Sequence, residues 1–216
     1  MTHRIELIIL NLTRIKDSAA VIHTLSREFG RRSFITGTGA GSRMAALLPL
    51  SIVEAEIVEN RKSDLWRARN ITSLHPLFGI RDNIYKNSMT LFMSEVLFRT
   101  LSDGAAEEGL FEWCRNSILT LDAMDSDFSN FHLRFLLELA GALGFAPSPE
   151  DLLPFSESHY ASLKALSEGT MADAMMVPLN GESRNEMADI LLRYISYHSE
   201  SAINVRSLKV LRELFS

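Results

Sequence analysis

NFHLRFLLELAGALGF, residues 130–145, is the stretch that decides the fold of this chain. Its apolar residues fall on almost every side of a helix, which is typical of a helix buried among other elements. Its charged residues, Arg134 and Glu138, are four apart and therefore share one face. Asn130 or the serine before it is expected to cap the start, and Gly144 to end the helix. A helix of this kind needs other helices around it.

The flanking sequence predicts those helices. Apolar residues at three- and four-residue spacing predict helices over residues 85–101, 107–124, 184–198 and 204–215. Ser183 is the expected cap of the third of these. A shorter helix is expected over 157–167. The rest of 146–182 holds four of the six prolines and is expected to be loop.

The first 75 residues follow a different pattern, in which short apolar runs alternate with polar residues. This pattern predicts strands over residues 4–12, 19–26, 31–36, 50–59 and 65–74. No helix of ten residues separates them, which favours a small closed antiparallel barrel, and the five-stranded OB-fold is common among such barrels. Pro76 disfavours helical geometry at His75 and marks a boundary. The expected fold is α+β with two domains, an N-terminal OB-fold barrel in residues 1–76 and an all-α helical domain in 77–216.

Composition excludes several classes of protein. With 46% hydrophobic and 23% charged residues, the chain has a globular rather than a disordered composition. The only cysteine is Cys114, which excludes a disulfide framework and a cysteine-rich metal site. No apolar run reaches membrane-spanning length, and the N-terminus lacks the pattern of a signal peptide. The expected location is the cytoplasm.

Charge is distributed unevenly along the chain. Residues 1–75 contain 11 basic and 7 acidic residues, a net of +4, whereas residues 76–216 contain 11 and 20, a net of −9. A difference in sign between segments indicates different partners.

No motif for catalysis or metal binding is present in the sequence. The histidines lack the spacing of a zinc enzyme, and His132 is expected to be packed in the core. The glycine-rich loop at residues 37–43 ends in Ser-Arg and lacks the lysine of a phosphate-binding loop. Acidic runs lack the paired partners of acid–base catalysis. We therefore expect neither an enzyme nor a cofactor.

Five stretches share their order and spacing with one known family. They are AAVIHTLSREFGRRSFITGTGAGSR at 19–43, LLPLSIVEAEI at 47–57, YKNSMTLFMSEVLFRTL at 85–101, RFLLELAGALGF at 134–145 and SLKVLRELF at 207–215. In these stretches the chain resembles the RecO family of bacterial DNA repair and recombination mediators. Many members of that family carry a four-cysteine zinc motif near the region matching 146–182. This chain has no cysteine there, so the resemblance is to a variant without zinc.

The resemblance implies a function and partners. It implies binding of single- and double-stranded DNA, strand annealing, and partnership with RecR. It also implies contact with the acidic C-terminal tail of the single-stranded-DNA-binding protein. It further implies that the protein helps to load a RecA-type recombinase onto DNA coated by the single-stranded-DNA-binding protein. Such a protein would associate with the nucleoid. In similar proteins the loop after the third strand is often rich in Arg and Lys, whereas here it offers only Arg43.

The basic residues of the barrel are the candidates for DNA binding, because phosphate contacts supply much of the affinity for nucleic acids. They are Arg14, Lys16, Arg27, Arg31, Arg32, Arg43, Arg61, Lys62, Arg67 and Arg69. Arg31, Arg32 and Arg43 flank the third strand and its loop and rank first, and Arg61 and Lys62 in the next hairpin rank second. The competing interpretation is that these are ordinary strand-surface charges. The function would then be that of a protein-only adaptor with little affinity for DNA.

Arg134 is the candidate for binding a partner peptide. By resemblance it occupies the position of the family's tail-binding arginine, and a guanidinium can bind a carboxylate through two hydrogen bonds. The competing interpretation is an ion pair with Glu138 that holds the helical domain together.

Overall fold

The computed structural model of the chain describes residues 2–38, 44–60, 63–104, 107–155 and 158–215. It contains two compact units, neither of which is one continuous segment. The first comprises Met1–Phe78 with Leu101–Ile118, and the second comprises Gly79–Thr100 with Leu119–Ser216. The stretch that follows the first long helix therefore belongs with the strands, which the sequence pattern does not indicate.

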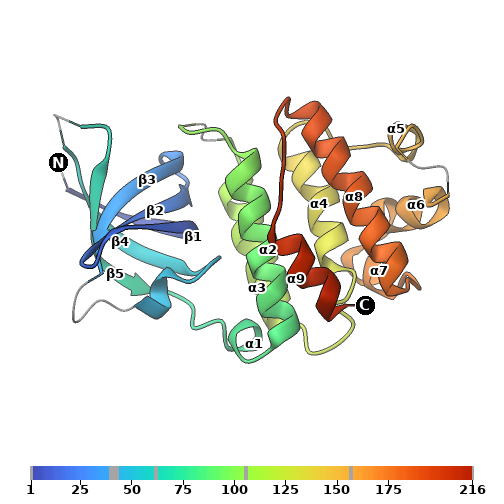
Figure 1. The fold of residues 1–216 in the computed structure, drawn as a ribbon, viewed down its shortest axis with the longest axis horizontal. Helices are drawn as coiled ribbons and strands as arrows, with labels where there is room; N and C mark the ends of the chain where they lie inside the picture. Colours follow the sequence, from blue (N-terminus) through green and yellow to red (C-terminus); the bar gives the residue numbers. More distant parts are fainter. Residues whose placement is uncertain (1, 39–43, 61–62, 105–106, 156–157, 216) are drawn as a thin grey trace. The chain divides into compact units, whose positions relative to one another are not determined.

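The first unit contains a closed five-stranded barrel (Figure 1). Its strands are β1 (Thr2–Lys16), β2 (Ala19–Ser26), β3 (Gly30–Gly37), β4 (Ile52–Val58) and β5 (Trp66–Ser73), with a 3-10 turn, η1 (Met44–Leu47), between β3 and β4. The order around the barrel is β1-β2-β3-β5-β4. All pairings are antiparallel except β3 with β5, which is parallel. The predicted OB-fold barrel is confirmed, with the correction that its closing pair is not antiparallel.

Alternate side chains along the strands fill the barrel, as the two-residue period of a strand requires. Leu7, Ile9, Ile22, Phe34 and Ile57 are all fully buried in one apolar cluster. The sequence leaves the direction of Phe34 open, and the structure places it in the core.

The remaining elements are helices, and the longer ones lie where the sequence predicts them. They are α1 (Phe78–Arg81), α2 (Ile84–Thr100), α3 (Leu110–Ala123), α4 (Phe131–Ala142), α5 (Pro149–Leu152), α6 (Tyr160–Glu168), α7 (Met171–Met176), α8 (Gly181–His198) and α9 (Ser207–Leu214). In the second unit α4 packs against α2, α6, α7 and α8, and α9 packs against α2 (Figure 1). The stretch at 130–145 is thus the buried helix that the sequence predicts. None of the described helices is long and apolar enough to cross a membrane.

Two short helices, α5 and α7, lie where the sequence predicts loop. Each begins with a capping box. In this motif the hydroxyl of the first residue accepts from the backbone N–H three residues on, and the acidic side chain of that residue accepts from the backbone N–H of the first. Ser148 pairs with Asp151 in α5, and Thr170 pairs with Asp173 in α7. The loop prediction is therefore wrong at these points, because it gave the prolines more weight than these local hydrogen bonds.

The start of α4 is held by a different contact from the one expected. Asn130 occupies the cap position, but its side chain makes no capping hydrogen bond. Its amide nitrogen instead donates to the carbonyls of Ala174 at 3.1 Å and Val177 at 2.8 Å, and its oxygen accepts from Arg184 at 3.0 Å. Asn130 thereby ties α4 to the end of α7 and to α8. The cap of α8 is Asn180, which corrects the prediction of Ser183.

Two buried titratable groups, His132 and Cys114, are neutral. Burial, with a contribution from the nearby charge of Arg184, lowers the pKa of His132 to about 3. Burial raises the pKa of the Cys114 thiol to about 12. Neither group is charged near neutral pH, which fits packing rather than chemistry.

The last helix, α9, is anchored by a carboxylate on α2. Glu95 accepts from the backbone N–H of Ser207 at 2.9 Å and from its hydroxyl at 2.7 Å. Burial of the carboxylate opposes its ionisation, but these hydrogen bonds outweigh that effect and lower the pKa of Glu95. The rings of Tyr85 and Phe215, 5.3 Å apart, add an edge-to-face contact.

Replacing Leu136 with Ala is expected to lower the free energy of unfolding by about 2–5 kcal/mol, because Leu136 is fully buried and its truncation leaves a cavity. Urea unfolding followed by circular dichroism measures the change. Leu91→Ala is the matched control, since Leu91 is 41% exposed and its loss is expected to cost no more than about 0.5 kcal/mol. Equal effects of the two substitutions would contradict the burial of α4.

Replacing Glu95 with Gln is expected to flatten the acid limb of the stability profile. The folded-state pKa of Glu95 lies below the unfolded value of about 4.3, so its stabilisation is present above that pH and is lost as pH falls through the folded-state pKa. Thermal unfolding at neutral and acidic pH measures this. The variant should have a lower Tm at neutral pH and a smaller drop on acidification, whereas Glu107→Gln, at an exposed position, should keep the wild-type drop.

Candidate nucleic-acid interface

Arg31, the first of the predicted DNA contacts, is engaged within its own unit. Its guanidinium donates to the carbonyl of Leu101 at 2.9 Å and lies 3.3 Å from the carboxylate of Asp103. The side chain is only 17% exposed. Its backbone carbonyl also accepts from Gly104 at 2.8 Å, so Arg31 fastens the residues after α2 to the barrel.

Arg32 lies on an aromatic surface. Its guanidinium carbon is 3.7 Å from the ring centre of Trp66 and 5.5 Å from that of Phe29, and it donates to the carbonyl of Asp64 at 3.3 Å. The two rings meet edge to face at 5.4 Å. A nucleobase can stack on this face of Trp66 only if Arg32 moves away.

The other predicted contacts on the barrel, Arg43, Arg61 and Lys62, lie outside the described residues. Arg31 and Arg32 line a shallow pocket of about 410 Å³ together with Asp64 and Asp103. Two carboxylates beside two guanidinium groups reduce the attraction of this pocket for phosphate.

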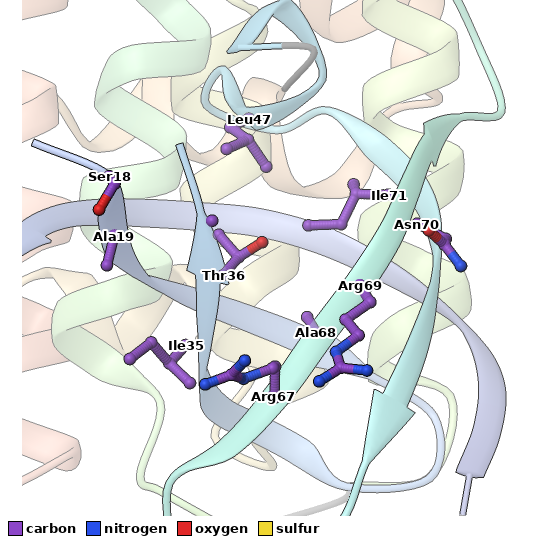
Figure 2. A pocket seen from close by; sticks show the side chains of 11 residues that line it. Ser18, Ala19, Ile35, Thr36, Leu47, Arg67, Ala68, Arg69, Asn70 and Ile71 are labelled. Atoms are coloured by element: carbon purple, nitrogen blue, oxygen red, sulfur yellow. The ribbon is translucent and has the colours of Figure 1, made fainter. Parts of the chain in front are cut away.

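A second hollow of the barrel opens where β3 and β5 separate. These strands pair at only two positions, Phe34 with Trp66 and Ile35 with Arg67. Figure 2 shows the strands diverging beyond this pair. The resulting hollow, which we call the β3–β5 groove, has a volume of about 540 Å³. It is lined by residues 35–37 of β3, residues 67–71 of β5, Ser18, Ala19 at the start of β2, and Leu47 of η1.

Arg67 and Arg69 supply the positive charge of the β3–β5 groove. Both are exposed, and as alternate residues of one strand they lie on the same face. Within the described parts of the chain, neither guanidinium has a hydrogen bond or an ion pair. Arg27, by contrast, is paired with both Glu6 and Glu112.

A bulge in β5 gives the groove two chemically different ends. Arg69 lies opposite Glu56 and Thr72 opposite Glu54, so one extra residue is accommodated between them. Asn70 takes the strained position with a φ of 51° and donates to Glu56 at 2.8 Å. The extra residue shifts the alternation, so that Ile71 rather than Asn70 packs on the core.

The two ends of the β3–β5 groove are visible in Figure 2. The guanidinium groups of Arg67 and Arg69 lie towards one end, and Leu47 and Ile71 lie towards the other. Both arginines are among the basic residues of the barrel that the sequence offers as DNA contacts, but they are not among the five ranked first and second. The signal that could have favoured them is the alternation in WRARN, which places both arginines on one face of a strand.

Arg134, the predicted peptide contact, takes part in a network inside the second unit. Its Nε donates to Glu138 at 2.7 Å, so the predicted ion pair is present. Its Nη1 donates to the carbonyls of Leu166 at 2.6 Å and Ser167 at 3.0 Å, in the last turn of α6. The side chain is 16% exposed. These bonds satisfy carbonyls that have no partner within their helix.

No group of three or more His, Cys, Asp or Glu side chains is arranged to hold a metal ion in the described ranges. The segment around α6 and α7 is joined to α4 by the contacts of Asn130 and Arg134.

The sequence itself matches known proteins over almost its full length. Residues 81–151 match the family model described as "Recombination protein O C terminal". The protein of Phocaeicola vulgatus called DNA repair protein RecO is 29% identical, and the alignment covers 97% of both chains. Proteins of the same name from Flavobacterium johnsoniae and Porphyromonas gingivalis are 26% and 27% identical, over 97% and 96% of this chain and 97% of each relative.

The chain is thus similar to RecO proteins along almost its whole length. The matches cover both the strands and the helices. The family model alone covers α2, α3 and α4, the part of the chain that contains the buried helix.

Replacing Arg134 with Ala is expected to loosen α6 and to lower the free energy of unfolding by about 1–3 kcal/mol, because carbonyls of its last turn lose a charged donor. Amide hydrogen exchange over residues 160–168 measures the loosening. Lys164→Ala, on the exposed side of the same helix, is the control and should change the unfolding free energy by no more than about 0.5 kcal/mol. Unchanged exchange in α6 of the Arg134 variant would show that these bonds are dispensable.

Proposed function

We propose that this protein is a recombination mediator of the RecO type in DNA repair. It binds single- and double-stranded DNA on the barrel, promotes annealing and, with RecR, helps load a RecA-type recombinase onto DNA coated by the single-stranded-DNA-binding protein. The names of the relatives support the repair role. The observation that carries DNA binding is the pair of exposed arginines, Arg67 and Arg69, in the β3–β5 groove.

Phosphate groups bind best to cationic side chains that are not already paired with a carboxylate of the protein. A guanidinium already paired with a carboxylate has to break that pair first, and the gain in affinity is smaller. Arg31 and Arg27 are engaged in this way, whereas Arg67 and Arg69 have no partner to lose among the described residues. Neutralising the phosphates of two strands on one such surface is what annealing requires.

In the same proposal, the helical unit receives the acidic tail of the single-stranded-DNA-binding protein at Arg134. The Nη2 atom of Arg134 makes no hydrogen bond to a described residue, while Nε and Nη1 are held by Glu138 and the end of α6. A carboxylate of the tail would therefore meet one remaining donor in a fixed orientation.

Replacing Arg67 and Arg69 together with Gln is expected to weaken binding of single-stranded DNA and its dependence on salt. Each phosphate contact contributes about 0.7 to the slope of log affinity against log salt for single strands, so the slope should fall by about 1.4. Fluorescence anisotropy of a labelled oligonucleotide, between about 50 and 200 mM salt, measures it.

The matched control for this measurement removes two positive charges elsewhere. Arg206→Gln with Lys209→Gln changes exposed residues at α9 by the same total charge, and it should leave the slope unchanged. Equal slopes for all three proteins would place the DNA elsewhere. Absence of binding by the wild-type protein at low salt would instead favour the protein-only adaptor, for which the internal pairing of Arg31 with Asp103 is the supporting observation.

A further inference from the structure

We propose that the β3–β5 groove takes up one unpaired nucleotide, with its phosphate at Arg67 and Arg69 and its base at the apolar end formed by Leu47 and Ile71. This inference rests on the proposed binding of DNA and narrows it to a class of ligand. The ligand is a strand with unpaired bases, or a base that has left its duplex.

The size of the groove fits such a ligand. Its volume of about 540 Å³ lies within the range of about 300–1,000 Å³ that is typical of sites for small ligands. The β3–β5 groove therefore has room for one nucleotide. It lies between strands of the barrel, where the walls are held by strand pairing on both outer sides.

One end of the groove is positively charged and the other is apolar, just as a nucleotide has a charged phosphate at one end and a base with apolar faces at the other. Figure 2 shows the two guanidinium groups towards one end and the side chains of Leu47 and Ile71 towards the other. Thr36, from β3, presents its hydroxyl between them (Figure 2). Phosphate oxygens pair with cations, and the faces of a base are apolar enough to pack on aliphatic side chains, so the two ends of the groove match the two ends of the ligand.

The occupied aromatic surface nearby strengthens this assignment. Proteins that bind single strands usually stack bases on exposed aromatic rings. Here the face of Trp66 is covered by Arg32 at 3.7 Å, and Phe34 is fully buried. Leu47 and Ile71, which line the same hollow as the free arginines, are thus the apolar side chains that we assign to the base.

A base inside a duplex cannot reach the apolar end, because it is paired and stacked. Extruding it costs a few kcal/mol, and the cost is smallest where the base is already unpaired. The groove therefore favours single strands over duplexes for reasons other than charge, since both carry phosphates. Such a preference suits a protein that handles strands before they pair.

The test compares two oligonucleotides with equal numbers of phosphates, one of thymidine and one in which every base is absent. We expect the wild-type protein to bind the thymidine strand at least about tenfold more tightly in fluorescence anisotropy, a gain of the size that burying part of one base against apolar side chains supplies. Equal affinity for the two strands would overturn base uptake and leave the proposed DNA binding intact. Failure to bind either strand would refute the proposed function itself.

A groove-filling variant tests the location. Gly37 lines the groove, its backbone is not strained, and an added Cβ would meet only the carbonyl of Ser18 at 3.9 Å. Gly37→Leu should therefore fold, and it should reduce the preference for the thymidine strand to within about twofold while affinity for the abasic strand stays unchanged. Gly37→Ala, with the same backbone change and little added volume, should keep the preference. An undiminished preference in Gly37→Leu would overturn the location.

Discussion

Only two residue pairs of β3 and β5, Phe34 with Trp66 and Ile35 with Arg67, close the described barrel. The β3–β5 groove exists because this pairing is so short. The parallel pairing joins β3 to β5 and encloses the apolar cluster around Phe34. Because the pairing does not extend beyond Ile35 and Arg67, the two strands separate there, and their facing edges line the β3–β5 groove. A longer pairing would bury these edges and leave no hollow. The same short pairing thus leaves both a closed core and an open groove.

The distribution of charge on the barrel matters more than its sum. Glu6 accepts from both Arg27 and Arg115, and Arg4 lies within 3.4 Å of both Glu54 and Glu56. These pairs join strands to one another and to α3. They neutralise arginines that the composition of the barrel alone would suggest as DNA contacts. What remains for a polyanion is a smaller set of cations that have no acidic neighbour in contact.

The helical unit is held together by polar side chains that reach the ends of other helices. Asn130 donates to carbonyls at the end of α7, and Arg134 donates to those at the end of α6. The buried Lys86 does the same at the end of α3, through the carbonyls of Asp122 and Met124. The last carbonyls of a helix lack partners within it and carry partial negative charge, so these donors stabilise them. In this way the segment around α6 and α7 is fixed to α4 without cysteine ligands.

The sequence by itself determined the elements of this protein. Two-residue alternation specified the five strands, and three- and four-residue spacing specified the long helices, because each period follows from the local geometry of the backbone. The apolar surround of residues 130–145 identified the buried helix for the same reason. The same patterns do not predict the short helices α5 and α7, because a capping box at the start of each, and not a repeat of apolar residues, specifies them.

Only the tertiary structure decided which charges are free. Arg31 and Arg67 look alike in the sequence, yet Arg31 meets Asp103, which is 72 positions away, whereas Arg67 meets no carboxylate in the described chain. The shift that brings Ile71 into the groove depends on a bulge opposite β4, and Arg134 reaches the end of α6 because α4 and α6 pack together. Side-chain pairing of this kind depends on distances between residues remote in sequence, and no local period encodes them.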